Sequence, residues 1–156
     1  MKRMSARSAG ILAFRRGPDG LEVLLAHPGG PFWRNKDAGV WSIPKGEINP
    51  DEDPLAAAVR EFQEETECVS AGDFLALGEV KQAGGKVVIA FAVEADIDAG
   101  TIRSNSFEME WPPRSRKTQE FPEIDRAGWF DLATARAKIN PAQAMFLERL
   151  EQALHS

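Results

Sequence analysis

The residues best suited to chemistry are glutamates that gather in one short segment, between Gly46 and Cys68. Glu61, Glu64 and Glu65 are spaced i, i+3 and i+4, so a helix over these positions would present three carboxylates from consecutive turns. Like charges at these spacings destabilise an exposed helix by roughly a few tenths of a kcal/mol per pair. A hard divalent cation such as Mg²⁺ would convert the repulsion into a binding site, with waters and substrate phosphates completing its coordination.

A solvated acidic surface is the alternative explanation for the same spacing. The glutamates lie in the C-terminal half of the expected helix, where the macrodipole disfavours negative charge. Arg60 is the one cation close to them in sequence. Both features favour a metal site, although helical spacing alone leaves the two interpretations open.

The expected helix has a clear start and a defined apolar side. An Asp-Pro pair at positions 53–54 can cap the free N–H groups and begin the first turn. The following residues, Leu55–Glu67, are mostly good helix formers. We expect three apolar residues, spaced i, i+4 and i+7, to form the buried stripe roughly opposite the glutamates: Leu55, Val59 and Phe62.

Around this helix, apolar runs and turn signals predict strands and helices that interleave, which is typical of an α/β fold with a mixed β-sheet between helices. Two segments without such a pattern, Pro28–Val40 and Ser104–Glu123, are expected to be long loops, which in compact domains are usually functional. The expected strands are Gly10–Phe14, Leu21–Ala26, Trp41–Pro44, Phe74–Gln82, Lys86–Ala95 and Gly128–Asp131, and the further helices are Leu132–Lys138 and Pro141–Leu154.

Length and composition are those of one ordinary domain. The chain has 156 residues, of which 43% are hydrophobic and 28% charged, which argues against wholesale disorder. We expect a single domain over residues 1–156, with residues 1–8 as a flexible tail. One cysteine excludes an intramolecular disulfide and suits a reducing cytoplasm. The apolar run Ala9–Phe14 is too short for a signal-peptide core or a membrane span.

The net charge of the chain limits the kinds of binding partner that we expect. A formal net charge of −5 argues against a protein that coats DNA or RNA, which needs a basic face. It does not argue against a small phosphate-bearing molecule, because a bound metal reverses the local sign. The two histidines, His27 and His155, lie far from the glutamate segment in sequence, and we expect both at the surface or in loops.

The segment GEINPDEDPLAAAVREFQEETEC, residues 46–68, resembles the Nudix box, G-x5-E-x7-R-E-U-x-E-E-x-G-U, in which U is a bulky aliphatic residue. Six fixed positions at fixed spacings are far more specific than a short motif. The order of expected strands and helices is also similar to that of Nudix hydrolases over nearly the whole chain. The resemblance implies a Nudix-type α/β/α sandwich. The positions in register are Gly46, Glu52, Arg60, Glu61, Glu64 and Glu65.

Three positions depart from the pattern. Phe62 replaces an aliphatic residue on the expected buried stripe. Glu67 replaces the glycine that ends the helix, where a left-handed C-cap favours Gly, and Cys68 replaces an aliphatic residue and behaves as a small hydrophobe. None of the three changes removes a catalytic carboxylate.

The resemblance implies a role for each matching residue. Arg60 would pin the helix carboxylates through paired hydrogen bonds, and Glu52 would be an outer partner that holds the loop and the metal waters. The metal would neutralise phosphate oxygens and lower the pKa of a bound water that attacks phosphorus. The implied ligands of Mg²⁺, for which Mn²⁺ can substitute, are Glu61, Glu64, Glu65 and the carbonyl of Gly46.

The general base differs among families of this type. Glu61 and Glu65 are candidates, as is a glutamate from a distant loop. Glu123 precedes a tryptophan by six residues, a spacing similar to that of the outlying glutamate ligand in mutator-type Nudix enzymes. We therefore include Glu123 among the catalytic residues and metal ligands. The alternatives in the same segment are Glu120 and Glu110.

The lead-in to the box, WSIPKG at residues 41–46, is similar to the diadenosine polyphosphate, diphosphoinositol and RNA 5′-pyrophosphate branches of the family. Lys45 would hold a polyphosphate tail as a point charge. In the preceding expected loop, we expect Arg34 to contact phosphates and Trp33 to offer a ring for a base. The chain has no tyrosine, so the stacking tyrosine of some dinucleoside tetraphosphate hydrolases has no counterpart.

We therefore expect Mg²⁺-dependent hydrolysis of a phosphoanhydride bond in a nucleoside polyphosphate, with a dinucleoside polyphosphate as the leading substrate. The alternatives are a pyrophosphatase that removes modified (d)NTPs and a Nudix-fold module that senses a nucleotide without cutting it. The intact set of Arg60 and the glutamates favours an enzyme. The only partner that we expect is the small substrate, with no DNA and no membrane. We expect a monomer or homodimer in the cytoplasm.

Overall fold

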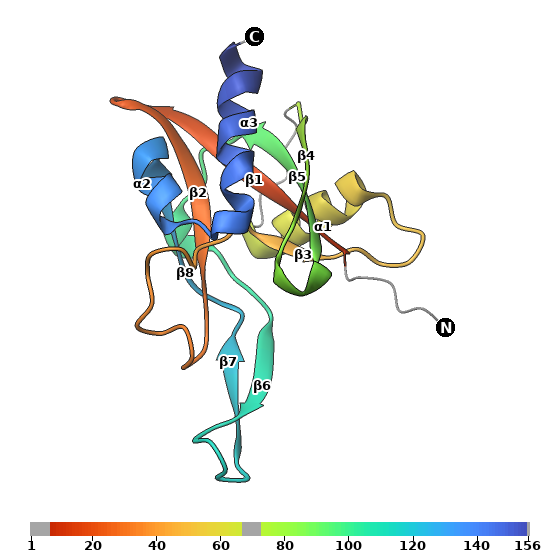
Figure 1. Cartoon of the computed structure of the whole chain (residues 1–156), viewed down its shortest axis with the longest axis vertical. Coiled ribbons are helices and arrows are strands. Elements are labelled where there is room, and N and C mark those ends of the chain that lie inside the picture. Colours follow the sequence, from red (N-terminus) through yellow and green to blue (C-terminus); the bar gives the residue numbers. More distant parts are fainter. Residues whose placement is uncertain (1–6, 67–72, 156) are drawn as a thin grey trace.

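The structure is a computed structural model that describes residues 7–66 and 73–155, and its centre is a mixed β-sheet with helices on both faces (Figure 1). The strand order is β4-β5-β1-β2-β8. β1 and β5 run parallel, the other neighbours run antiparallel, and β3 pairs with the first part of β1. The strands are β1 (Arg7–Gly17), β2 (Gly20–Pro28), β3 (Lys45–Glu47), β4 (Leu75–Lys81), β5 (Val87–Glu94), β6 (Ser106–Glu110), β7 (Thr118–Pro122) and β8 (Ile124–Asp131). The helices are α1 (Pro54–Thr66), α2 (Leu132–Lys138) and α3 (Ala144–His155), with short 3₁₀ turns η1 (Ala83–Gly85), η2 (Ala99–Thr101) and η3 (Pro141–Gln143).

Two apolar cores lie on opposite faces of this sheet. Ile11 and Leu12, adjacent in β1, belong to different cores because successive side chains of a strand point to opposite faces. Phe62 of α1 packs in the core of Ile11, and Leu147 of α3 packs in the core of Leu12. Burial of each such side chain contributes roughly 1.5–3 kcal/mol. The expected α/β class, with a mixed sheet in an α/β/α sandwich, is confirmed.

The buried face of α1 differs from the expected stripe. Leu55 and Val59 are only half-buried, whereas Ala58 and Phe62 are buried. Glu65 follows these two residues at the i, i+4, i+7 spacing, so its side chain lies on the sheet-facing side and is 7% exposed. The expectation that Glu65 lies opposite the buried stripe was therefore wrong.

The segment Ser104–Glu123 is a β-hairpin for most of its length and not the expected loop. Strands β6 and β7 pair with each other in a separate two-stranded sheet that projects from the body of the protein (Figure 1). Alternation of Phe107 and Met109 with Glu108 and Glu110 is a strand pattern. The prolines between the two strands obscured this pattern, because proline disfavours strand interiors.

Other element boundaries shift by a few residues. Trp41 and Ser42 form isolated bridges, and the strand that follows them, β3, begins only at Lys45. Arg7 and Ser8 pair with β5 as part of β1, so they do not belong to the expected tail, and residues 1–6 lie outside the described residues. Among the described helices, none is long and apolar enough to cross a membrane.

Candidate active site

Arg60 connects the loop before α1 to the carboxylates of the helix. Its Nε and Nη2 donate to the two carboxylate oxygens of Glu52, at 3.0 and 2.9 Å, and its Nη1 donates to Glu61 at 2.8 Å. Glu52 also accepts a hydrogen bond of 3.1 Å from the backbone N–H of Asn49. The Arg60 hydrogen bonds are the main cause of a lowered pKa of Glu52, and they raise the pKa of Arg60. The hydrogen bond from Arg60 thereby fixes the orientation of the Glu61 carboxylate.

Gly46 lies directly against the carboxyl group of Glu61. A Cβ at position 46 would be 2.1 Å from the Glu61 Cδ and 2.4 and 2.5 Å from its oxygens. No real side chain tolerates such distances, so only glycine allows this approach. The main chain of β3 and the first expected metal ligand of α1 are therefore neighbours.

Glu65 is the most unusual ionisable group of the site. Its Oε2 atom is buried and has no hydrogen-bond partner among residues 7–66 and 73–155. Burial, together with the nearby carboxylates of Glu61, Glu123 and Glu64, raises the pKa of Glu65 to about 8, while Lys45 opposes the shift. Buried polar atoms are normally hydrogen-bonded. An oxygen left without a partner among other carboxylates fits a metal ligand, because a divalent cation would supply the missing partner.

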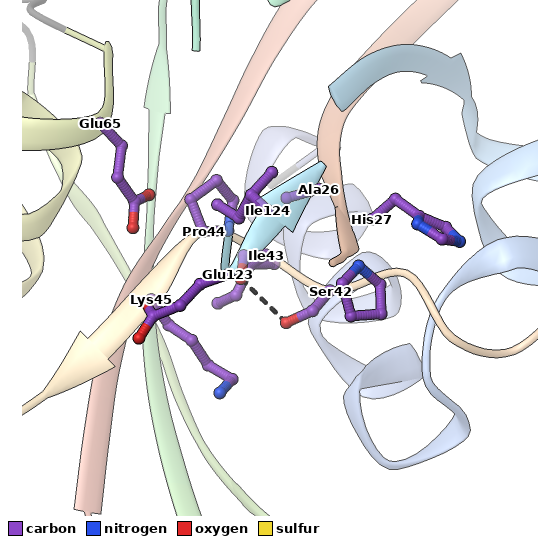
Figure 2. Close-up of a pocket in the computed structure, with 10 residues that line it drawn as sticks. Ala26, His27, Ser42, Ile43, Pro44, Lys45, Glu65, Glu123 and Ile124 are labelled. Carbon is purple, nitrogen blue, oxygen red and sulfur yellow. Dashed lines mark hydrogen bonds between the residues drawn. The ribbon is translucent and has the colours of Figure 1, made fainter. Parts of the chain in front are cut away.

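Glu123 reaches this region from a distant part of the chain. Lys45, Glu65 and Glu123 line one cavity of about 180 Å³, and Figure 2 shows their side chains around it, each from a different segment. The backbone N–H of Glu123 donates to the carbonyl of Asn105 at 2.8 Å, and its carbonyl accepts from the N–H of Gly29 at 2.9 Å. The outlying glutamate therefore lies beside the box residues, and its role as a metal ligand or base stays a prediction.

Two further cavities complete the region. One is lined by Lys45, Gly46, Glu61 and Glu123, and the other by Glu61, Glu64 and Glu65. Within residues 7–66 and 73–155, however, no three acidic, histidine or cysteine side chains are close enough together to enclose a metal ion. Glu61 is directed by Arg60, and the Glu64 side chain is 54% exposed. The donors are all oxygens, which suit Mg²⁺ or Mn²⁺. To hold one ion together, these side chains would have to lie closer to one another than they do here.

Trp33 and Arg34 lie in a turn of the segment between β2 and β3. Arg34 is exposed, and Trp33 is half-buried with its ring edge-on to Phe32 at 4.8 Å. Neither residue lines the three cavities described above. Glu67 and Cys68, the two departures at the end of the box, lie outside the described residues.

His27 was expected at the surface or in a loop and is instead fully buried at the end of β2. Its Nδ1 is 2.8 Å from a carboxylate oxygen of Asp125, and its Nε2 donates to the carbonyl of Lys36 at 2.6 Å. It also lines the cavity of Glu65 and Glu123. The strand pattern could have predicted this burial, because His27 follows Val23 and Leu25 at a spacing of two residues and so points to the same face of the sheet. His155, in contrast, is exposed in the last turn of α3.

Sequence comparison identifies the family. A profile of the NUDIX domain matches residues 4–150, so the chain belongs to the NUDIX family, and as a Nudix hydrolase it is an enzyme of the expected class. No curated protein sequence matches the chain.

Solved structures of the family have the same fold. The chain is similar to a C. elegans Ap4A hydrolase in a binary complex, with a TM-score of 0.61 and 21% identity over 96% of this chain and 98% of that one. It is similar to a mutT/nudix family protein from Listeria innocua, with a TM-score of 0.66 and 17% identity over 98% and 96%. The NUDIX domain of Shewanella oneidensis NrtR, complexed with ADP ribose, gives a TM-score of 0.65 and 18% identity over 98% and 90%.

Proposed function

We propose that this protein hydrolyses a phosphoanhydride bond of a nucleoside polyphosphate in a reaction that depends on Mg²⁺. The observation that carries the proposal is the buried Oε2 of Glu65, which lies among other carboxylates and has no partner in the part of the chain that the structure describes. A site of this kind is unfavourable without a cation and favourable with one. The ligands that we propose are Glu61, Glu64, Glu65, Glu123 and the carbonyl of Gly46.

The bound metal would neutralise phosphate oxygens and acidify the attacking water. The chain's own residues orient the site: Glu52 holds Arg60, and Arg60 holds Glu61. Glu61, Glu65 and Glu123 are the candidates for the base that accepts the proton of the water, because each lines a cavity of the site.

A pair of lysines supports a polyphosphate over a single phosphate. Lys45 and Lys86 line the same cavity, and neither forms an ion pair within the described part of the chain. Burial lowers the pKa of Lys45, and the nearby charge of Lys86 lowers it further. A chain of phosphates between the two ammonium groups would relieve their repulsion. We therefore propose that Lys45 and Lys86 hold the phosphates beyond the metal.

A dinucleoside polyphosphate is the substrate class that we propose first. One structure similar to this chain is an Ap4A hydrolase, and another has ADP ribose bound. Both structures are less than 25% identical to this chain, so the lysine pair supports a polyphosphate substrate more directly than they do.

The test is a substrate panel with product identification, run with MgCl₂ and with EDTA. A dinucleoside polyphosphate should give two nucleotides, whereas a pyrophosphatase acting on nucleoside triphosphates should give a monophosphate and pyrophosphate. Glu64→Gln should lower turnover by at least about a hundredfold. Glu79→Gln, an exposed glutamate of β4, is the matched control.

Two results would overturn the proposal. One is turnover that does not change when the metal is chelated. The other is that the wild-type protein cuts no member of the panel while it and Glu64→Gln bind nucleotides with equal affinity. The protein would then be a nucleotide sensor.

A further inference from the structure

Gln143, in the turn η3 just before α3, is a fully buried amide whose polar atoms are all bonded. Its Oε1 accepts from the backbone N–H of Ile43 at 3.1 Å, and its Nε2 donates to Oε1 of Gln82 at 2.9 Å and to Oγ of Ser42 at 3.0 Å. A backbone N–H can only donate, so Oε1 must face Ile43 and Nε2 must face Gln82. Burial of an amide is unfavourable unless it is bonded in this way, so the side chain fixes the positions of its partners.

The first partner, Ile43, leads to Lys45. Ser42 and Ile43 line the same cavity as Lys45, on one continuous stretch of chain (Figure 2). Only Pro44 stands between Ile43 and Lys45, and its ring fixes its φ angle. The bond from Ile43 to Gln143 therefore restrains the point at which the Lys45 side chain begins.

The second partner, Gln82, leads to Lys86. Gln82 follows β4, and its backbone N–H donates to the carbonyl of Lys86 at 2.7 Å, which closes the turn η1. Gly84 and Gly85 of this turn have φ angles of +82° and +80°. A turn built on two glycines has little stiffness of its own, so Gln82 is the point from which Lys86 is held.

The two lysines need such a restraint because they repel each other. Lys45 and Lys86 line one cavity, and like charges at close range favour separation. They flank β1: Lys45 pairs with Gly10 of that strand, and β5, which follows Lys86, pairs with β1 on its other side. The amide of Gln143 bridges the two segments directly, so it restrains the gap between the two ammonium groups.

We infer that Gln143 is a positioning residue that sets the spacing of Lys45 and Lys86 and thereby favours a polyphosphate over a single phosphate. The inference rests on the proposed function, which assigns the two lysines to the phosphates. The amide touches no substrate itself, since it is fully buried. A chain of phosphates must reach both ammonium groups at once, whereas a single phosphate needs only one of them.

The test compares two inorganic ligands, tripolyphosphate and orthophosphate, titrated calorimetrically into the full chain with MgCl₂. Gln82→Leu breaks the bridge on the side of Lys86 at a half-buried position, and Gln143→Met breaks it altogether. Both should weaken tripolyphosphate binding about three- to tenfold and change orthophosphate binding by less than about twofold. Gln119→Leu is the matched control, because it removes a glutamine bond of 3.2 Å in the β6–β7 hairpin and should change neither affinity.

A double-mutant cycle separates positioning from a merely structural role. If Gln82 acts through Lys86, Lys86→Ala should cost less tripolyphosphate affinity in the Gln82→Leu background than in the wild-type protein. The same cycle with Gln119→Leu should be additive. Additive losses with Gln82→Leu, equal losses for the two ligands, or no loss from Lys86→Ala would each overturn the inference.

Turnover distinguishes this inference from the proposed function. Mg²⁺-dependent hydrolysis together with an additive cycle would keep the proposed function and refute the positioning role of Gln143. Coupling between Gln82 and Lys86 in a protein that cuts no nucleotide would keep the positioning role and refute the proposed function.

Discussion

The α-carbon of Gly46 faces the carboxyl group of Glu61 so closely that a methyl group on Gly46 would lie 2.1 Å from the Glu61 Cδ. Gly46→Ala must therefore displace Glu61, which Arg60 holds by a hydrogen bond of 2.8 Å. We expect about a ten- to hundredfold loss of activity, the size usual for a disturbed ligand partner, and a higher Mg²⁺ concentration at half-maximal rate.

Gly100→Ala is the control for this change. A Cβ there would meet only a side-chain oxygen of Asp98, at 3.3 Å, and Gly100 has no left-handed φ. Activity and metal dependence should stay at the wild-type level. A Gly46→Ala enzyme with an unchanged Mg²⁺ titration would contradict the placement of Gly46 at the metal site.

Arg60→Lys should be damaging although it keeps the charge. The guanidinium donates to both oxygens of Glu52 and to Glu61 in one fixed plane, which an ammonium cannot reproduce. We expect turnover to fall about ten- to hundredfold with a small change in the thermal midpoint. Arg136→Lys is the matched control, since Arg136 joins two glutamates at the exposed surface of α2 and α3. Similar rates for the two variants would refute the positioning role of Arg60.

Glu52→Gln tests the same network from its other end. The amide can accept only at one atom, so the paired bond to Arg60 is lost and Arg60 is freed to move from Glu61. The metal affinity, measured by Mn²⁺ titration, should weaken by about tenfold or more. An unchanged affinity would show that Glu52 serves the loop at Asn49 alone.

The box could be predicted from the sequence because its chemistry is local. Gly46 meets Glu61, and Glu52 meets Arg60, through the turn and helix that join them, so fixed spacings define the contacts. The burial of Glu65 could not be predicted in the same way. It depends on Ala58, whose small side chain lets α1 lie close to the sheet. The expected buried stripe was instead placed on the larger residues Leu55 and Val59.

Long-range pairings account for the other differences. The partners of His27 are a carboxylate 98 residues away and a loop carbonyl, neither of which a strand pattern encodes. Glu123 became a candidate because a family spacing indicated it, while the hairpin of β6 and β7 that leads to it was hidden by its prolines. The partners of Gln143 lie 61 and 100 residues away in sequence, so no local pattern of the chain indicates them.

His27→Gln should destabilise the protein much more than the same substitution at His155. The buried imidazole joins β2 to Asp125 and to the carbonyl of Lys36, and glutamine cannot keep both bonds in the same geometry. Unpartnered groups would remain inside, so we expect a loss of about 1–3 kcal/mol in the free energy of unfolding, measured in urea. The exposed His155→Gln should lose less than about 0.5 kcal/mol. Equal stabilities of the two variants would contradict the bonding of His27.

The raised pKa of Glu65 makes stability depend on pH. Its pKa is about 8 in the folded, metal-free protein, against an ordinary value of 4.5. Between these values the folded chain binds one more proton than the unfolded chain, so the free energy of unfolding falls as pH rises, by at most about 1.4 kcal/mol per pH unit. The contribution of this group is fully present below pH 4.5 and is lost above pH 8.

Urea unfolding between pH 5.5 and 8.5 measures this effect directly. Glu65→Gln cannot titrate, so its stability should fall less steeply over the range than that of the wild-type protein, and Glu79→Gln should follow the wild-type slope. Mg²⁺ favours the ionised carboxylate and lowers its pKa, so saturating Mg²⁺ should flatten the wild-type slope toward that of Glu65→Gln. Parallel slopes for wild type and Glu65→Gln without metal would show that Glu65 is already ionised at neutral pH, and the argument from its buried oxygen would fail.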